Sequence, residues 1–297
     1  EGDTKTYRNV LVISFLLNII LNPILIFGFL FIPAFGVKGI GIATIISQLV
    51  SFLVILFKVL KNERVRKITS EYLVPKFLFF KNIFFQSMPI SVSICGYALA
   101  AAIIFTYVGQ SGEYAVAGYG VGTRIEQVVL LPILGINTAI ISIIAQNYGA
   151  NNLYRIKETY FTAIKYAFII MITAGTLVFL SASVITSFFS SDPEVIEYGK
   201  RYLKISAFVL PAYPVFFLSN GFFMALKKSE NAMISNFFRN VLNPIAVFYI
   251  AKYINASFET FFWLWVGINW FFSISYFFII IYYFKLKLNK PSTVVNP

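Results

Sequence analysis

The sequence predicts an all-α polytopic membrane protein, and three observations support this. The chain of 297 residues is 59% hydrophobic and only 12% charged, whereas soluble domains are roughly 25% charged. Its apolar residues gather in eight runs, each close to the roughly 20 residues that a helix needs to cross a bilayer. A four-residue motif recurs 221 positions later, as expected for a fold built from two similar halves.

The predicted transmembrane helices span about residues 10–32, 38–60, 84–108, 114–147, 161–189, 198–225, 230–252 and 260–284. Four prolines within the third, fourth and sixth runs predict kinks, which membrane bundles tolerate because neighbouring helices satisfy the freed backbone groups. These prolines are Pro89, Pro132, Pro211 and Pro214.

Lysine and arginine predict the orientation, because they collect in cytoplasmic loops. With the N-terminus placed inside, 18 basic residues fall on the inside and 5 on the outside, and Arg124 is left within the membrane. We therefore expect a multi-pass protein of the plasma membrane, the inner membrane of a bacterium, with both termini in the cytoplasm. Basic cytoplasmic loops also explain the net charge of +12, so this charge does not indicate a nucleic-acid partner.

Composition also excludes several kinds of chemistry. The chain contains no histidine, so imidazole catalysis and imidazole metal ligation are excluded. No cluster of acids suggests a catalytic constellation, and we expect the protein not to be an enzyme. The single cysteine, Cys95, lies in an apolar run, where a packed thiol is the expected state.

The repeated motif indicates how the helices are grouped. Leu21-Asn22-Pro23-Ile24 in the first predicted helix recurs as Leu242-Asn243-Pro244-Ile245 in the seventh. A period of six helices predicts a 12-helix protein of six plus six, whose last eight helices are present here. The first residue is not methionine and the opening residues resemble the inside of a loop, so we interpret the chain as a fragment. The predicted domains are residues 1–60, the last two helices of an N-terminal lobe, residues 61–82, a cytoplasmic linker, and residues 83–297, a six-helix C-terminal lobe.

The fourth apolar run carries a charged pair, Arg124 and Glu126, far from its ends. A charge at this depth costs a few kcal/mol and usually faces a bundle interior or a wet cavity, where it serves function. Residues two apart point to different faces of a helix, so the two need not pair. A structural role for Glu126, as a buried ion pair or an interhelical hydrogen bond, is the alternative. Arg239, near the inner end of the seventh run, is expected to extend to the headgroups.

Several motifs resemble the multidrug and toxic compound extrusion (MATE) family over the whole chain. Asn18-Ile-Ile-Leu-Asn22-Pro23 and the following Gly36-Val-Lys-Gly39-Ile-Gly41 look like the family's fifth and sixth helices. Gly120-Val-Gly-Thr-Arg124-Ile-Glu126 and Ala145-Gln146-Asn147-Tyr148-Gly149-Ala150 look like its eighth helix.

The resemblance implies a secondary active efflux transporter that exports amphipathic, often cationic compounds in exchange for Na⁺ or H⁺ by alternating access between two lobes. No cofactor is implied beyond the coupling ion, and the expected partners are small amphipathic molecules and the bilayer, with the full-length protein a monomer. The alternatives are a lipid-linked saccharide flippase of the same superfamily and a membrane fragment that transports nothing.

Two departures from the family pattern bear on the coupling ion. Asn22 replaces an acid found in many relatives, and the acids of one branch are replaced at Gly96 or Tyr97 and at Ser219 or Asn220.

Glu126 is therefore the predicted coupling site, together with Asn18 and Asn22. A carboxylate in apolar surroundings can load and release a proton near neutral pH, and it is also a hard oxygen ligand for Na⁺. Aromatic walls suit flat cationic compounds through stacking and cation–π contact. The residues predicted to line a substrate cavity are Tyr97, Tyr107, Tyr119, Asn137, Phe216, Phe217 and Phe222.

Overall fold

The computed structural model describes residues 4–29, 32–62 and 77–285, and nearly all of them are helical. Six of the described helical segments are long and apolar enough to cross a membrane, and they correspond to the first, second, fourth, fifth, sixth and eighth predicted runs. The third run lies in α4 (Phe77–Val108), and the seventh is divided into shorter segments. The predicted all-α membrane fold is thus confirmed, while the number of eight spans stays a prediction.

The chain forms two compact units, Glu1–Phe80 and Lys81–Pro297, and each is described by itself. The predicted linker of residues 61–82 is described only at residues 61, 62 and 77–82, because residues 63–76 lie outside the described ranges.

The first unit is a helical hairpin of α1 (Thr4–Phe27) and α2 (Val37–Lys61). The two helices approach closely at Gly39, where an added Cβ would lie 2.5 Å from the carbonyl oxygen of Leu25. Small residues at such contacts allow helix backbones to pack in a membrane, where van der Waals contact replaces the hydrophobic effect. The Ser14 hydroxyl also donates to the Ser47 carbonyl at 3.2 Å.

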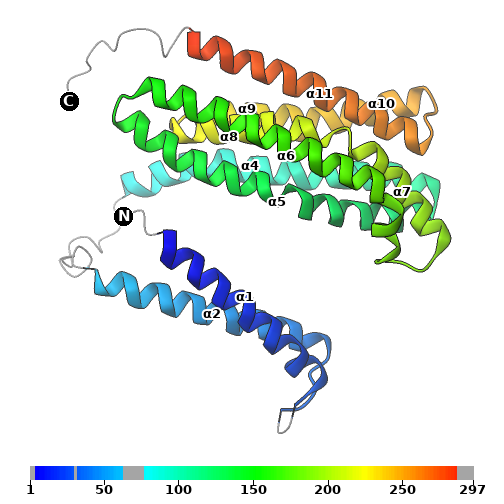
Figure 1. The fold of residues 1–297 in the computed structure, drawn as a ribbon, viewed down its shortest axis with the longest axis horizontal. Coiled ribbons are helices and arrows are strands. Elements are labelled where there is room, and N and C mark those ends of the chain that lie inside the picture. Colours follow the sequence, from blue (N-terminus) through cyan, green and yellow to red (C-terminus); the bar gives the residue numbers. More distant parts are fainter. Residues whose placement is uncertain (1–3, 30–31, 63–76, 286–297) are drawn as a thin grey trace. The chain divides into compact units, whose positions relative to one another are not determined.

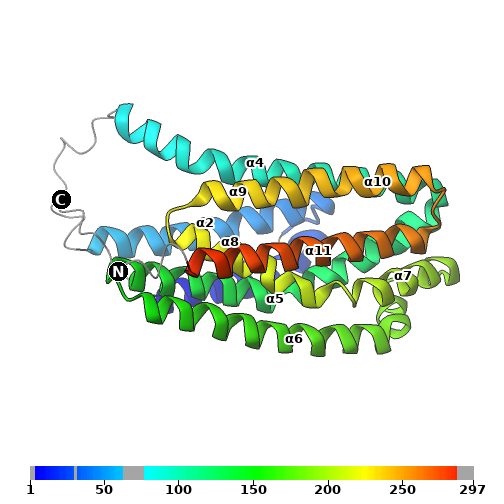
Figure 2. The same cartoon turned by 90° about the horizontal axis from the view of Figure 1, so that it is seen from above.

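The second unit is a bundle of helices that lie roughly along one axis, as Figure 1 shows. In Figure 2, α4 and α6 lie at opposite edges of this unit. Its elements after α4 are η2 (Gly109–Ser111), α5 (Glu113–Gly149), α6 (Leu153–Ser187), α7 (Pro193–Ser206), η3 (Leu210–Ala212), α8 (Tyr213–Ala225), α9 (Ser229–Phe237), η4 (Phe238–Leu242), α10 (Asn243–Tyr253) and α11 (Phe258–Tyr283). The long helix α5 packs against α6, α7 and α8, and therefore forms the centre of the unit.

Side-chain caps fix where three of these helices begin. Asn152 accepts from the backbone N–H of Arg155 at the start of α6. Asp192 accepts from the N–H groups of Glu194 and Val195 at the start of α7, and Ser257 caps α11 in the same way. These oxygens satisfy amide donors that have no partner within the first helical turn.

Prolines coincide with the two interruptions of the longer runs. The sixth run is broken between α7 and α8, with Pro211 in η3 and Pro214 in the first turn of α8. In the seventh run η4 is a π-helical turn, and Pro244 follows it in the first turn of α10. A proline is tolerated in the first turn of a helix because its missing N–H would be unpaired there in any case. By contrast, α5 continues as one α-helix through Pro132.

Candidate functional site

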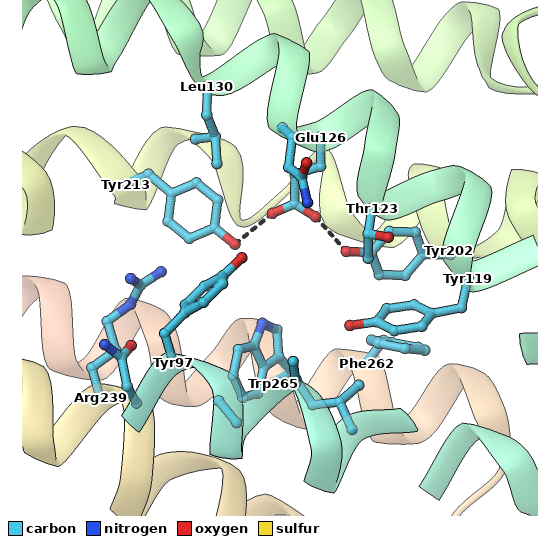
Figure 3. Close-up of a pocket in the computed structure, with 15 residues that line it drawn as sticks. Tyr97, Tyr119, Thr123, Glu126, Leu130, Tyr202, Tyr213, Arg239, Phe262 and Trp265 are labelled. Atoms are coloured by element: carbon cyan, nitrogen blue, oxygen red, sulfur yellow. Dashed lines mark hydrogen bonds between the residues drawn. The ribbon is translucent and has the colours of Figure 1, made fainter. Parts of the chain in front are cut away.

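The carboxylate of Glu126 is held by two tyrosine hydroxyls from different helices (Figure 3). Tyr213, the first residue of α8, donates to Oε1 at 2.6 Å, and Tyr202 of α7 donates to Oε2. Both tyrosines are buried, at 6% exposure. Glu126 lies 13 residues into α5, about 20 Å from the start of the helix at 1.5 Å per residue. The acid is therefore deep in the bundle, with both oxygens oriented.

Close packing of α5 on α7 brings Tyr202 to the acid. An added Cβ at Gly118 would lie 2.7 Å from the backbone nitrogen of Gly199, and one at Gly122 would lie 2.2 Å from the ring of Tyr202. The Tyr202 ring also packs edge-on against Tyr119, with ring centroids 4.9 Å apart. The Gly-x-x-x-Gly spacing of α5 thus provides the space that the phenol needs beside Glu126.

Glu126 faces a cavity of about 110 Å³, which we call the acid cavity. Figure 3 shows that Tyr97 and Trp265 reach into it from other helices, with Arg239 at one side. This volume is room for an ion with a few waters, since one water occupies about 30 Å³ of liquid. The lining residues are Tyr97, Ala100, Ala101, Ile104, Tyr119, Thr123, Glu126, Gln127, Leu130, Tyr202, Tyr213, Arg239, Asn240, Phe262 and Trp265.

The expectation for Arg239 is wrong. Its guanidinium lies over the ring of Phe216, 4.1 Å from the centroid, and its Nε donates to Asn269 Oδ1 at 3.1 Å. It lies ten residues beyond the start of α9, which is about 15 Å along the helix. An extended side chain does not turn towards the headgroups when rings and an amide hold it inside the bundle.

Arg124 and Glu126 point to different faces of α5, as their spacing predicted. Arg124 is exposed, whereas Glu126 is half-buried and bonded to tyrosines. Among the described residues, the ion pairs join Arg155 to Glu158 and connect Glu197, Lys200, Arg201 and Glu259. A buried ion pair with Arg124 is therefore not the state of Glu126 in this structure.

The predicted cavity aromatics divide into two groups. Tyr97 and Tyr119 line the acid cavity, and Phe216 lines a second cavity. Phe217 is half-buried, with its ring centroid 5.8 Å from the Arg239 guanidinium.

Tyr107, Asn137, Phe217 and Phe222 line none of the cavities described here, so the prediction that they line a substrate cavity is not confirmed. The Tyr107 ring stacks on Phe261 and its hydroxyl donates to the Ala256 carbonyl at 2.7 Å. Phe222 is fully buried among other rings. In so aromatic a chain most rings are used for packing between helices, and a sequence does not separate these from rings that face a cavity.

The predicted amides Asn18, Asn22 and Asn137 lie in two places. In the first unit, Asn22 donates to Asn18 at 2.9 Å, and Asn18 lies 3.5 Å from the Thr44 hydroxyl. Asn137 lies against α8, where an added Cβ on Gly221 would be 2.0 Å from its Oδ1. The Oδ1 atoms of Asn22 and Asn137 are buried without a protein hydrogen-bond partner. Cys95, expected to be packed, is exposed.

Sequence reasoning missed Tyr202, Tyr213 and Arg239 as neighbours of the acid. They lie 76, 87 and 113 positions from Glu126, so no local spacing connects them to it. The sequence contained one indication, the position of Arg239 within an apolar run. A charged residue in such a run is a candidate functional residue for the same reason as Glu126. Within the described ranges, no group of three or more His, Cys, Asp or Glu is placed to hold a metal ion.

Comparison with known proteins finds similarity to membrane transporters. The FAD transporter of Shewanella oneidensis is 24% identical over 86% of this chain and 56% of its own length. The probable multidrug resistance protein YpnP of Bacillus subtilis is 27% identical over 90% of this chain and 56% of its own. An outward-facing multidrug resistance MATE family transporter of the MOP superfamily superposes with a TM-score of 0.83, at 25% identity over 95% of this chain and 63% of that chain.

The chain thus spans a little over half the length of these curated relatives. The family described as MatE matches residues 89–249, which is more than half of the sequence and includes α5, α7 and α8 with the acid and its tyrosines. The chain therefore belongs to the MatE family.

Proposed function

We propose that the protein is a secondary active transporter that exports amphipathic compounds in exchange for Na⁺ or H⁺. The observation that carries the proposal is the carboxylate of Glu126, held by two phenols beside a small cavity inside a membrane-spanning bundle. Keeping an acid at this depth costs free energy, and acids at such positions typically bind and release a cation. The names of the relatives, an FAD transporter and a probable multidrug resistance protein, support transport of organic solutes.

In this proposal Glu126 is the site of the coupling ion. Its carboxylate oxygens are hard ligands for Na⁺ and are also the place where a proton would bind. Tyr202 and Tyr213 hold both oxygens in position, and Thr123 contributes a hydroxyl to the same cavity. Asn18 and Asn22 provide amide groups for a second ion position within the first unit.

The proposed location is the plasma membrane of a bacterium, with both ends of this chain in the cytoplasm and a monomer as the working unit. The basic residues of the loops support this orientation.

The test uses the native full-length polypeptide that carries this sequence, reconstituted in liposomes. Ethidium efflux is followed under an imposed Na⁺ gradient and, separately, an imposed H⁺ gradient. Efflux driven by one gradient and lost in Glu126→Gln supports both the exporter and the site. Glu158→Gln is the matched control, because Glu158 is an exposed acid paired with Arg155 and lies outside the acid cavity.

Two results would contradict the proposal in different ways. Gradient-driven efflux that persists in Glu126→Gln removes the coupling role from the acid and leaves the transporter. No efflux under either gradient favours lipid flipping. A flippase for a lipid-linked saccharide needs a strongly basic cavity to bind a pyrophosphate, and here one carboxylate and one guanidinium line the acid cavity.

A further inference from the structure

A second and larger cavity lies between α8, α9, η4 and α11. We call it the aromatic cavity, because eight of its fourteen lining residues are Phe or Tyr, against 19% aromatic residues in the whole chain. Its volume of about 460 Å³ is within the range of roughly 300–1,000 Å³ typical of sites for drug-sized ligands. The enrichment in flat rings indicates a ligand that is itself flat and aromatic.

The charge in this wall is positive. Arg239 is the one residue of the described lining that is charged at neutral pH, and the lining includes no carboxylate. Its guanidinium lies 4.1 Å from the centroid of Phe216 and 4.9 Å from that of Tyr213. A guanidinium stacked on aromatic rings keeps its N–H donors in its own plane, where they are available to an anion at its edge.

The donors of Arg239 are only partly used by the protein. Nε donates to Asn269, and none of the ion pairs of the described residues includes Arg239. A guanidinium has five N–H donors, and a carboxylate or phosphate can accept two of them at once. Glu126 lines the acid cavity together with Arg239 and attracts it, but the two form no direct ion pair in the described part of the chain. An anionic ligand on the aromatic side would therefore give the guanidinium the direct hydrogen-bonded partner that Glu126 does not provide.

We propose that the aromatic cavity binds an amphipathic aromatic anion, with its carboxylate, sulfonate or phosphate on Arg239 and its ring between the Phe and Tyr side chains. The hydroxyls of Ser235 and Ser275 and the amide of Asn231 line the same cavity and suit polar substituents of the ring. The proposed ligand defines a substrate class. Calling it a substrate rests on the proposed transport function, whereas its binding to the cavity does not require transport. It also departs from the cationic substrates that the resemblance to the MATE family implies.

The depth of Arg239 favours a free solute over a membrane lipid. The guanidinium is on a residue about 15 Å along the helix from the start of α9. A phospholipid keeps its charge at the headgroup level, whereas a solute can carry its charge to this depth when a cation meets it there. The eight rings likewise match an aromatic ligand better than an acyl chain.

The experiment measures binding by calorimetry to the full-length protein in nanodiscs of zwitterionic phosphatidylcholine, with empty nanodiscs as the blank. The probes are 2-naphthoate and 2-naphthylmethylammonium, which share a ring and differ in charge. We expect the wild type to bind naphthoate at least tenfold more tightly, and Arg239→Gln to lose this preference. Arg124→Gln is the matched control, because Arg124 is an exposed arginine of α5 that lines neither the acid cavity nor the aromatic cavity.

A second variant keeps the proposal testable if Arg239→Gln fails to fold. Ser275→Trp fills the aromatic cavity from α11 without changing Arg239, and it should weaken naphthoate binding at least tenfold. Equal affinity for both probes in the wild type, or an unchanged preference in Arg239→Gln, would overturn the proposal. Displacement of naphthoate by phosphatidylglycerol added to the nanodiscs would assign the cavity to a lipid and overturn it as well. Because no gradient is applied, failure of ion-coupled efflux leaves this result unaffected.

Discussion

At the scale of residues, the two phenols on Glu126 are the most specific feature of the site. Each carboxylate oxygen accepts a hydrogen bond from a buried tyrosine, and the two tyrosines come from α7 and α8. A hydrogen bond between helices in a membrane contributes about 0.6 kcal/mol on average. A bond to a charged acceptor contributes more, about 1.5–3 kcal/mol. The tyrosines therefore both orient the acid and join α5 to its neighbours.

We expect Tyr213→Phe to lower the free energy of unfolding by about 1–2 kcal/mol, because Oε1 loses its donor while the ring remains. Unfolding is measured by titration with SDS in mixed micelles. Tyr249→Phe is the control, since this tyrosine is 66% exposed and lies outside the acid cavity. Equal stability of Tyr213→Phe and the wild type would show that the hydroxyl contributes nothing to holding the acid.

At the scale of elements, the contact between α5 and α7 depends on two glycines of α5. An added Cβ at Gly118 meets the backbone of α7 at 2.7–2.8 Å, at Gly199 N and Val195 O, and backbone atoms have no rotamer by which to move away. Gly120, two residues further on, has nothing within 4 Å of its Cβ position. In α5, close packing therefore requires glycine at position 118 and does not require it at position 120, which makes Gly120 a matched control.

Gly118→Ala should cost about 1–3 kcal/mol of stability, the usual cost of overpacking. Gly120→Ala should be neutral or should stabilise by up to about 1 kcal/mol, because alanine favours the helix. Thermal unfolding in detergent, followed by size-exclusion chromatography, compares the two. Equal loss in both variants would mean that the close approach of α5 and α7 is absent in the folded protein.

An ion pair joins α7 to the first turn of α11, between Arg201 and Glu259 at 2.9 Å. Both side chains are more than a third exposed, at 46% and 37%, so solvent screens their attraction. We expect a double-mutant cycle of Arg201→Gln and Glu259→Gln to give a coupling energy below about 1 kcal/mol that decreases further in 1 M salt. A larger coupling that is insensitive to salt would indicate that the pair is buried in the bilayer.

At the scale of the whole molecule, the helices of the second unit fix which loops share a side of the membrane. Tyr154 and Phe188 lie at opposite ends of α6 and are 76% and 82% exposed. Tyr253, at the end of α10, is 88% exposed. The distribution of Lys and Arg predicts that Tyr154 faces the cytoplasm and the other two the outside.

Single cysteines in a Cys95→Ser background test this orientation in intact cells. A membrane-impermeant maleimide should label Phe188→Cys and Tyr253→Cys directly, and Tyr154→Cys only after permeabilisation. The opposite pattern would invert the topology and place both ends of this chain outside.

By itself, the sequence determined the class of the fold and the presence of an acid far from the ends of an apolar run. Apolar runs long enough for a bilayer must form helices, because no other open structure satisfies the backbone without water. The cost of a buried charge singled out Glu126 before any contact was known. The same cost applies to Arg239. The prediction that it lies near the end of its helix and reaches the headgroups was wrong about how deep the residue lies.

Only the tertiary structure decided what surrounds the acid. Tyr202 and Tyr213 meet Glu126 because Gly118 and Gly122 let α7 approach α5 and because α8 begins at Tyr213. Contacts between helices bring together residues 76 and 87 positions apart, and spacing along a chain has no information about these pairings. Tyr107, packed in the core, and Phe216, lining the aromatic cavity, were likewise indistinguishable in an apolar sequence. Both are buried, at 6% and 4% exposure, and only their position in the folded bundle separates them.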